Sequence, residues 1–380
     1  MSNSDTVVKM KVFGVGGGGN NTVDHLKTIG IDDKVITYAL NTDAQALKNS
    51  KADFKIKLGE ELTQGLGAGA LPSVGAEAAR ESRQLIEGHL DDTDILFIAA
   101  GMGGGTGTGA APEIANYARE KGLLTIAVVT TPFTFEGTNR MRSAIGGVKA
   151  LEETCDVCLV ISNQNLIHNH SDVFVEDAFE LPDNVLKTAI LAFIGVLTNS
   201  TTYGKDISYN QLKGMLTNAG LAVISIESSG KELPDDNKDA INADLDRKEA
   251  SGEFVDRERA IRAREIKFNL AKAIEKAVLS EMLDVSVRGA KSIILSIGYP
   301  EGTTRDNMQA DPHRIIRQLF NYTPEEYKNI NVTVTPYYHN KGTKEVEVTL
   351  IATGFEDDKT VDRVIKNKEE EIENSDILGV

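Results

Sequence analysis

The stretch that most constrains this chain is Gly101–Gly109, which reads Gly-Met-Gly-Gly-Gly-Thr-Gly-Thr-Gly. The apolar residues 94–100 before it have the pattern of a buried strand, and residues 110–118 after it have the pattern of a helix. Glycines between a strand and a helix let backbone N–H groups approach an anion, while the helix N-terminus adds partial positive charge. Thr106 and Thr108 add hydroxyl donors. The pattern predicts a phosphate-binding loop and disfavours a flexible linker.

Length and charge narrow the class of protein. A chain of 380 residues with 41% hydrophobic residues predicts a folded protein of two domains. Its net charge of -16 disfavours general binding to nucleic acid. We find no signal peptide and no apolar run that could span a membrane, and therefore expect a cytoplasmic protein.

Two more glycine-rich loops occur near the first. Gly14-x-Gly16-x-x-Gly19 follows the expected strand 8–15 and precedes a helix expected from Thr22. Alone it matches a dinucleotide-binding fingerprint. Residues 65–70 form the third loop, before a helix expected from Ser73 to about His89. Three such loops argue against an ordinary nicotinamide dehydrogenase. The sequence also offers no set of catalytic His–Asp or Lys residues that such an enzyme would need.

Strands and helices alternate through the first half of the chain, which predicts a mostly parallel sheet covered by helices on both faces. A long apolar helix is expected over residues 177–198. A charged stretch, residues 231–262, has the composition of an exposed insertion. The expected strands of a smaller α+β unit follow: 290–297, 330–338 and 345–352.

The two cysteines, Cys155 and Cys158, have Cys-x-x-Cys spacing. We place both on one strand, 155–161, where residues three apart face opposite ways. This disfavours a disulfide or redox pair. The six histidines are scattered, so we expect no protein metal centre.

Taken together, the glycine loops resemble those of the tubulin/FtsZ superfamily, and most of all bacterial FtsZ. The resemblance covers about residues 8–355 and rests on six motifs in order. These are Gly14–Gly19, Asn41–Leu47, Gly65–Ala70, Gly103–Gly109, Pro132–Arg142 and Asp183–Leu186.

The resemblance implies an α/β fold, in which a Rossmann-like GTP-binding domain is joined by a long central helix to a smaller α+β domain. It implies an N-terminal tail at 1–7, the GTP-binding domain at 8–176, and the central helix with the start of a catalytic loop at 177–204. An α+β domain would follow at 205–355, including the insertion 231–262, and an acidic tail at 356–380.

The resemblance also implies a binding site for GTP or GDP, with Mg²⁺ bridging the phosphates. Its residues would fall into four groups. Phosphate-holding residues would be Gly16, Gly17, Asn21, Gly103, Gly104, Gly105, Thr106, Gly107 and Thr108; γ-phosphate neighbours Ala68, Gly69 and Ala70; ribose ligands Glu136 and Arg140; and guanine ligands Asn163, Phe179 and Asp183.

Members of this family stack head to tail, and a loop of one subunit completes the catalytic site of the next. That loop has the form N-x-D-x-x-D, and the matching stretch here is residues 203–213. Counting from Asp183 puts Asp206 and Tyr209 at the acidic positions, whereas counting from Gly220 puts Ser208 and Gln211 there. Neither register keeps both acids, so slow hydrolysis is expected with Asp206 as the candidate catalytic residue.

Three more departures concern Leu71, where the family usually has asparagine, the insertion 231–262, which the family largely lacks, and the short tail, which lacks a clear adaptor-binding end. The expected function is a self-assembling cytoskeletal GTPase in bacterial cell division, with division or segregation adaptors as further partners. The alternative is a divergent or non-hydrolysing filament for plasmid or phage segregation.

Overall fold

The structure is a computed structural model. It describes residues 8–31, 35–168, 180–198, 208–230, 232, 234–280, 282–283, 286–301, 303, 312–319, 329–339 and 345–355. The tails at 1–7 and 356–380 lie outside these ranges, as do Phe179 and Asp206.

A single sheet of ten strands runs through the described residues, in the order β3-β2-β1-β4-β5-β6-β7-β10-β8-β9. The strands from β3 to β7 are all parallel, β10 pairs antiparallel with both β7 and β8, and β9 is parallel to β8. The strands are β1 Met10–Val15, β2 Val35–Asn41, β3 Phe54–Lys57, β4 Ile95–Gly101, β5 Leu124–Thr131, β6 Val157–Ser162, β7 Gly220–Ser229, β8 Ser292–Pro300, β9 Asn331–His339 and β10 Val346–Thr353.

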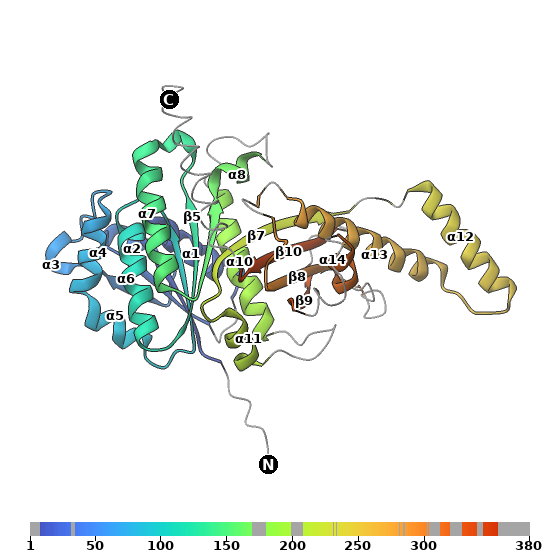
Figure 1. The fold of residues 1–380 in the computed structure, drawn as a ribbon, viewed down its shortest axis with the longest axis horizontal. Helices are drawn as coiled ribbons and strands as arrows, with labels where there is room; N and C mark the ends of the chain where they lie inside the picture. Colours follow the sequence, from blue (N-terminus) through green and yellow to red (C-terminus); the bar gives the residue numbers. More distant parts are fainter. Residues whose placement is uncertain are drawn as a thin grey trace, which may run out of the picture.

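Helices cover both faces of this sheet (Figure 1). One face packs against α4, α5, α6, α7 and α13, and the other against α1, α2, α10 and α11. These helices and the remaining ones are α1 Gly16–Ile29, α2 Ala44–Asn49, α3 Glu60–Thr63, α4 Pro72–Glu81, α5 Arg83–Leu90, α6 Thr106–Glu120, α7 Thr138–Thr154, α8 Asn163–His168, α10 Glu180–Thr198, α11 Tyr209–Leu216, α12 Asp235–Ala250, α13 Arg257–Val278 and α14 Pro312–Leu319. A 3₁₀ turn, η1, spans Thr134–Glu136.

Strands β1 to β6 have the order 3-2-1-4-5-6, the order of doubly wound nucleotide-binding sheets. Strand order reverses between β1 and β4, and ligands of such sheets bind outside the carboxyl ends of the strands at this point. The first two glycine loops follow β1 and β4. The predicted α/β fold is therefore confirmed, and its topology puts both loops at the reversal.

The central helix α10 joins the two halves (Figure 1). Ile190 and Phe193 are buried on the sheet face that includes Phe97 of β4 and Ile294 of β8. Because α10 packs against strands of both halves, it can transmit a displacement from one to the other. None of the helices in the described part of the chain is long and apolar enough to cross a membrane.

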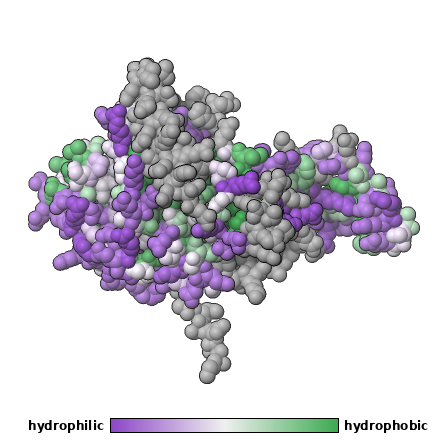
Figure 2. Space-filling view, in the orientation of Figure 1, coloured by the Kyte–Doolittle hydropathy of each residue, from purple (hydrophilic) through white to green (hydrophobic). Residues whose placement is uncertain are grey.

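The charged stretch from 231 projects from the body as α12 and the start of α13 (Figure 1). Arg257 bonds Glu249 at 2.8 Å, and Arg264 bonds Asp244 at 2.5 Å, which ties the two helices together. The described residues of this charged stretch are thus mostly helical. Figure 2 shows that the visible face of the N-terminal half is mostly hydrophilic.

Three sequence expectations about elements were wrong. Helix α1 begins at Gly16 and not at Thr22, because the glycines themselves form its first turn. The helix expected from Ser73 to His89 breaks at Ser82, whose Oγ accepts a bond from the Gly59 N–H at 2.9 Å. Strand β6 begins at Val157 and not at Cys155.

Backbone packing of α6 on α4 supplies a test of the fold. A Cβ added at Gly109 would lie 1.9 Å from the Pro72 carbonyl oxygen. We expect Gly109→Ala to lower the free energy of unfolding by about 1–3 kcal/mol, because the clashing atom belongs to the backbone and cannot move aside as the end of a flexible side chain can. Gly88→Ala in α5 is the matched control, since its Cβ meets no described atom within 4 Å and should stabilise by about 0.5–1 kcal/mol. Urea denaturation measures both; equal midpoints would contradict the packing.

Candidate functional site

Two helix N-termini without side-chain caps lie side by side at the strand-order reversal. Helix α1 follows β1 directly and α6 follows the Gly101–Gly105 loop after β4. Neither helix has a capping side chain or an acidic residue in its first turn. By contrast, Asp43 caps α2 and Asp256 caps α13. Uncapped N–H groups and two aligned helix dipoles create a site that favours an anion.

The glycines of the two loops have two different roles. At Gly19 an added Cβ would lie 2.2 Å from the Ala99 carbonyl oxygen, and at Gly107 it would lie 2.5 Å from that of Gly101. These glycines allow α1 and α6 to pack against β4. At Gly17 and Gly104 an added Cβ would meet no described atom within 4 Å. The second pair therefore borders space that the described residues leave open for a ligand.

The threonines of the second loop hold it in shape. The Thr106 and Thr42 hydroxyl oxygens lie 2.6 Å apart, and the Thr108 hydroxyl accepts a bond from the Gly103 N–H at 2.8 Å. We expected Thr106 and Thr108 as hydroxyl donors to phosphate. Each oxygen already has a partner in the protein, so positioning the loop is their first role, although Thr108 keeps its own proton to donate.

The third loop lies against the start of α6. Ala68 is buried, and a Cβ on Gly105 would lie 2.8 Å from the Ala68 Cβ. Gly69 and Ala70 have φ values of 57° and 58°. An alanine in this region costs about 1–2 kcal/mol, and such strain persists where the surroundings enforce it. The Leu71 N–H, which bonds the Ala68 carbonyl at 3.0 Å, closes this turn beside the two helix N-termini.

Glu136 and Arg140 lie together on the other side of the second loop. The Arg140 guanidinium pairs with the Glu136 carboxylate at 2.8 Å, and that carboxylate also accepts the Phe133 N–H at 2.8 Å. A Cβ on Gly103 would lie 2.8 Å from the Arg140 carbonyl oxygen. The start of α7 is therefore in contact with the loop, and Glu136 has fixed oxygens that can accept hydroxyl groups.

Asn21 and Asp183 meet where α1 packs on α10. The Asp183 carboxyl is buried and accepts a hydrogen bond from Asn21. Burial raises the pKa of Asp183 to about 6, against the effect of that hydrogen bond. Asn163, at the start of α8, is also buried, and its Oδ1 finds no partner among the described residues. A buried carboxylate and an orphaned amide oxygen are acceptors that suit a ligand with N–H groups.

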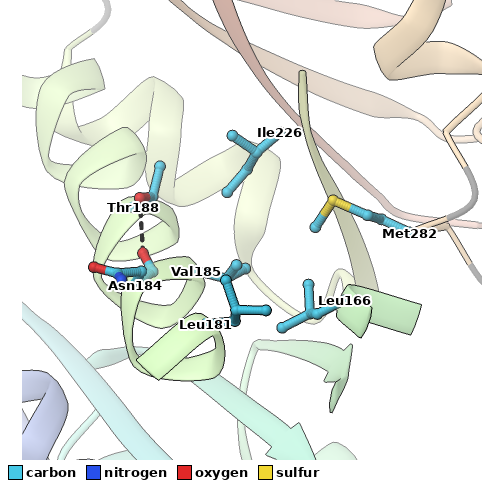
Figure 3. Close-up of a pocket in the computed structure, with 7 residues that line it drawn as sticks. All are labelled: Leu166, Leu181, Asn184, Val185, Thr188, Ile226 and Met282. Carbon is cyan, nitrogen blue, oxygen red and sulfur yellow. Dashed lines mark hydrogen bonds between the residues drawn. The ribbon is translucent and has the colours of Figure 1, made fainter. Parts of the chain in front are cut away.

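Helix α10 also borders an apolar cavity, on the side of the C-terminal half. The cavity measures about 190 Å³, and side chains of Leu181, Val185, Leu166, Ile226 and Met282 converge on it (Figure 3). The Thr188 hydroxyl at its edge donates to the Asn184 carbonyl at 2.8 Å (Figure 3). Asn184, which lines this cavity, directly follows Asp183 in the sequence. The cavity therefore lies beside the part of α10 that carries the candidate site residue Asp183.

The structure therefore gathers the described predicted residues around the carboxyl ends of β1, β4, β5 and β6. They come from two loops, from the turn η1 and from the helices α1, α6, α7, α8 and α10. The structure places neither Phe179 nor Asp206, which lie outside the described residues. The sequence analysis did not identify a hydrogen-bond network that joins the ends of β1 and β2 to α1. In it, Asn20 Nδ2 donates to the Gly14 carbonyl at 2.7 Å, and Asn41 Nδ2 donates to Asn20 Oδ1 at 2.8 Å. The position of Asn41 at the end of β2 was the available signal.

Comparison with known proteins gives consistent results. Residues 9–171 match the tubulin/FtsZ family, GTPase domain. The cell division protein FtsZ 1 of Methanocaldococcus jannaschii is 37% identical over 299 residues, which are 79% of this chain and 72% of that protein.

Solved structures agree in fold. An empty FtsZ dimer from M. jannaschii matches with a TM-score of 0.74 and 32% identity, over 92% of this chain and 89% of that one. A GTPγS-bound protofilament of CetZ2 from Haloferax volcanii matches with a TM-score of 0.66 over 97% of this chain and 100% of that one. At 17% identity, the second likeness shows the fold alone.

The buried Asp183 predicts a pH-dependent stability of the ligand-free protein. The pKa of Asp183 in the folded protein, about 6, exceeds the ordinary 3.8, because the fold favours the neutral carboxyl. The contribution of this group to the free energy of unfolding is therefore fully present below about pH 4 and is lost as the pH rises through 6. Asp183→Asn removes this loss and should raise the free energy of unfolding at pH 8 by up to about 3 kcal/mol. Urea midpoints between pH 4 and pH 8 measure the difference. A difference that does not change with pH would contradict the assignment.

Proposed function

This chain belongs to the tubulin/FtsZ family and is a GTPase, and on that premise we propose that it is a cytoskeletal protein whose subunits stack head to tail into filaments that serve cell division. The observation that carries the proposal is the distance between the two parts of the catalytic centre. The proposed nucleotide site lies at the carboxyl end of β4, whereas α11 lies at its amino end, where the Tyr209 hydroxyl donates to the Asp94 carbonyl at 3.2 Å.

The length of β4 separates these two parts. Its seven residues span roughly 20 Å at about 3.3 Å per residue. Residue 208, the first described residue after the candidate catalytic loop, therefore lies far from the nucleotide site of its own subunit. A head-to-tail contact would bring this end of one subunit to the nucleotide of the next, and such contacts propagate into filaments.

The candidate acid of that loop is best assigned to Asp206. Ser208 and Gln211, the residues of one register, bond each other as a helix cap, with the Ser208 N–H 3.0 Å from Gln211 Oε1. Tyr209, of the other register, donates its hydroxyl to Asp94. Because these three side chains already have partners within their own subunit, we propose that Asp206 orients the attacking water, and that hydrolysis is slow since a second acid is missing.

We propose that the triphosphate lies at the N-termini of α1 and α6, against Gly16, Gly17 and the Gly103–Thr108 segment. Ala68, Gly69 and Ala70 would approach the γ-phosphate, and Glu136 and Arg140 the ribose. The described residues contain no group of three or more His, Cys, Asp or Glu side chains that could hold a metal. Mg²⁺ would then be held chiefly by phosphate oxygens and water, as is usual for this hard cation.

Guanine would be recognised by Asp183, with Asn163 beside it and Phe179 stacking on the ring. The carboxylate accepts from the N1–H and 2-amino groups of guanine, whereas adenine offers an unprotonated N1 that repels it. We expect Asp183→Asn to reduce the preference for GTP over ATP about a hundredfold, because the amide oxygen still accepts one hydrogen bond while one bond to a charged group, about 1.5–3 kcal/mol, is lost. Competition titrations with labelled GDP measure this preference. Unchanged discrimination would assign guanine recognition elsewhere.

Gly104 tests the phosphate position separately from the fold. Because its added Cβ meets no described atom, Gly104→Ala should leave the urea midpoint unchanged. The methyl group would enter the proposed phosphate space and weaken GDP binding about tenfold to a hundredfold, from an overpacking cost of about 1–3 kcal/mol. Gly88→Ala is the control for both measurements. If GDP bound Gly104→Ala as tightly as the wild type, the phosphates would have to lie elsewhere.

Assembly and hydrolysis can be measured on the purified full chain. With GTP and Mg²⁺ we expect polymers by pelleting and electron microscopy, favoured by salt that screens the net charge of -16. Asp206→Asn should assemble but release phosphate about a hundredfold more slowly. Asp239→Asn, an exposed change on α12, is the matched control. No polymers over a wide range of salt and protein concentration would refute the filament proposal; polymers without phosphate release would support the non-hydrolysing alternative.

A further inference from the structure

The two cysteine thiols meet, contrary to the sequence expectation. Cys155 is not on a strand: it ends α7, where its N–H donates to the Leu151 carbonyl at 2.9 Å. The bend at residues 155–156 turns its side chain to the face that Cys158 occupies, and the two thiols share a hydrogen bond. Both belong to the same buried cluster, with Cys155 9% exposed and Cys158 fully buried. Neither is in a disulfide.

The segment between the two cysteines joins the halves of the protein. The Asp156 carbonyl accepts the Gly220 N–H at 2.9 Å, and its carboxylate accepts the Asn218 N–H at 3.1 Å. The next residues begin the pairing of β6 with β7, which has three register positions, Val157 to Leu159. Strands β7 and β10, by comparison, are paired over eight positions. The Cys155–Cys158 segment is therefore the short seam of the sheet, and α11 leads directly into it.

We propose that Cys155 and Cys158 are a redox-active dithiol, oxidised by peroxide to an intramolecular disulfide that alters the seam between β6 and β7. An ordinary buried cysteine packs as a small apolar residue and is inert. Two features distinguish this pair: the thiols interact with each other, and Cys155, at the end of α7, keeps 9% of its surface exposed whereas Cys158 keeps none.

The order of the chemical steps follows from exposure. The interaction with the Cys155 thiol, burial and the Glu152 carboxylate raise the pKa of Cys158, so it is a poor first nucleophile. The Cys155 sulfur attacks one peroxide oxygen and becomes a sulfenic acid, and the other oxygen leaves as water after protonation. The Cys158 sulfur then attacks the Cys155 sulfur, the S–O bond breaks, and a second water leaves. The dithiol loses two electrons and two protons, and the peroxide is reduced to two waters.

Oxidation must change the backbone between the sulfur atoms. A disulfide draws two sulfurs from hydrogen-bond contact to about 2.05 Å and constrains both Cβ positions. Only Asp156 and Val157 lie between them, and these residues hold the Asn218 and Gly220 N–H groups and begin the β6–β7 pairing. The strain would reach β7 and α11 through these bonds. We expect the oxidised seam to open more often than the reduced one.

The disulfide itself is tested on the folded full-length chain. After treatment with hydrogen peroxide, we expect the intact mass to fall by two hydrogens, both cysteines to resist alkylation, and dithiothreitol to restore two alkylatable thiols. Cys155→Ala and Cys158→Ala should each abolish this reversible loss. Two alkylatable thiols after peroxide, or oxidation to sulfinic acid without a disulfide, would overturn the proposal. The wild-type measurement needs no variant to fold.

Hydrogen–deuterium exchange tests the effect on the seam. We expect amides of residues 218–222 to exchange at least about tenfold faster in the oxidised chain, which corresponds to about 1.4 kcal/mol of lost protection. The double variant Cys155→Ala, Cys158→Ala controls for other effects of peroxide and should show no change. Equal exchange in oxidised and reduced wild type would overturn the coupling to the seam. Neither measurement depends on nucleotide binding. The dithiol proposal can therefore fail or succeed independently of the proposed GTP-dependent filament.

Discussion

The contact of backbone with backbone at the β1–β4 reversal is the constraint on which the other features depend. Gly19 and Gly107 allow α1 and α6 to approach β4 so closely that any side chain would meet a carbonyl oxygen. This approach brings two uncapped helix N-termini together and turns the other glycine pair, Gly17 and Gly104, toward unfilled space. The proposed phosphate site is thus made mainly of main-chain N–H groups, whose positions are set by packing and not by flexible side chains.

The parts of the fold that rest on strong local patterns could be predicted from the sequence. Apolar runs identified the strands, and the alternation with helices predicted a parallel sheet, which the structure confirms. Exact element ends could not be predicted. Four glycines have low helix propensity, yet they form the first turn of α1 because tertiary packing outweighs that preference. Ser82 interrupts a good helical pattern because its hydroxyl accepts a distant N–H group.

The candidate site was partly predictable for a similar reason. The family resemblance put Asp183 and Asn163 among the expected ligand groups, but only the fold reveals that one carboxyl is buried with a raised pKa and that one amide oxygen lacks a described partner. The cysteines show the opposite case. Strand β6 begins two residues later than expected, and the bend at residues 155–156 changes which face the Cys155 side chain takes; no pattern in the sequence indicates that bend.

In the proposed filament, the seven-residue strand β4 has a consequence for the order in which subunits hydrolyse their nucleotide. If one end of each subunit completes the nucleotide site of its neighbour, the subunit at one filament tip has an exposed nucleotide that no neighbour can attack. That tip retains its triphosphate while interior subunits convert theirs, one joint at a time. Hydrolysis at each contact between subunits can then begin only when that contact forms, independently of the other contacts. The chemical state along a filament becomes a record of the order in which its subunits arrived.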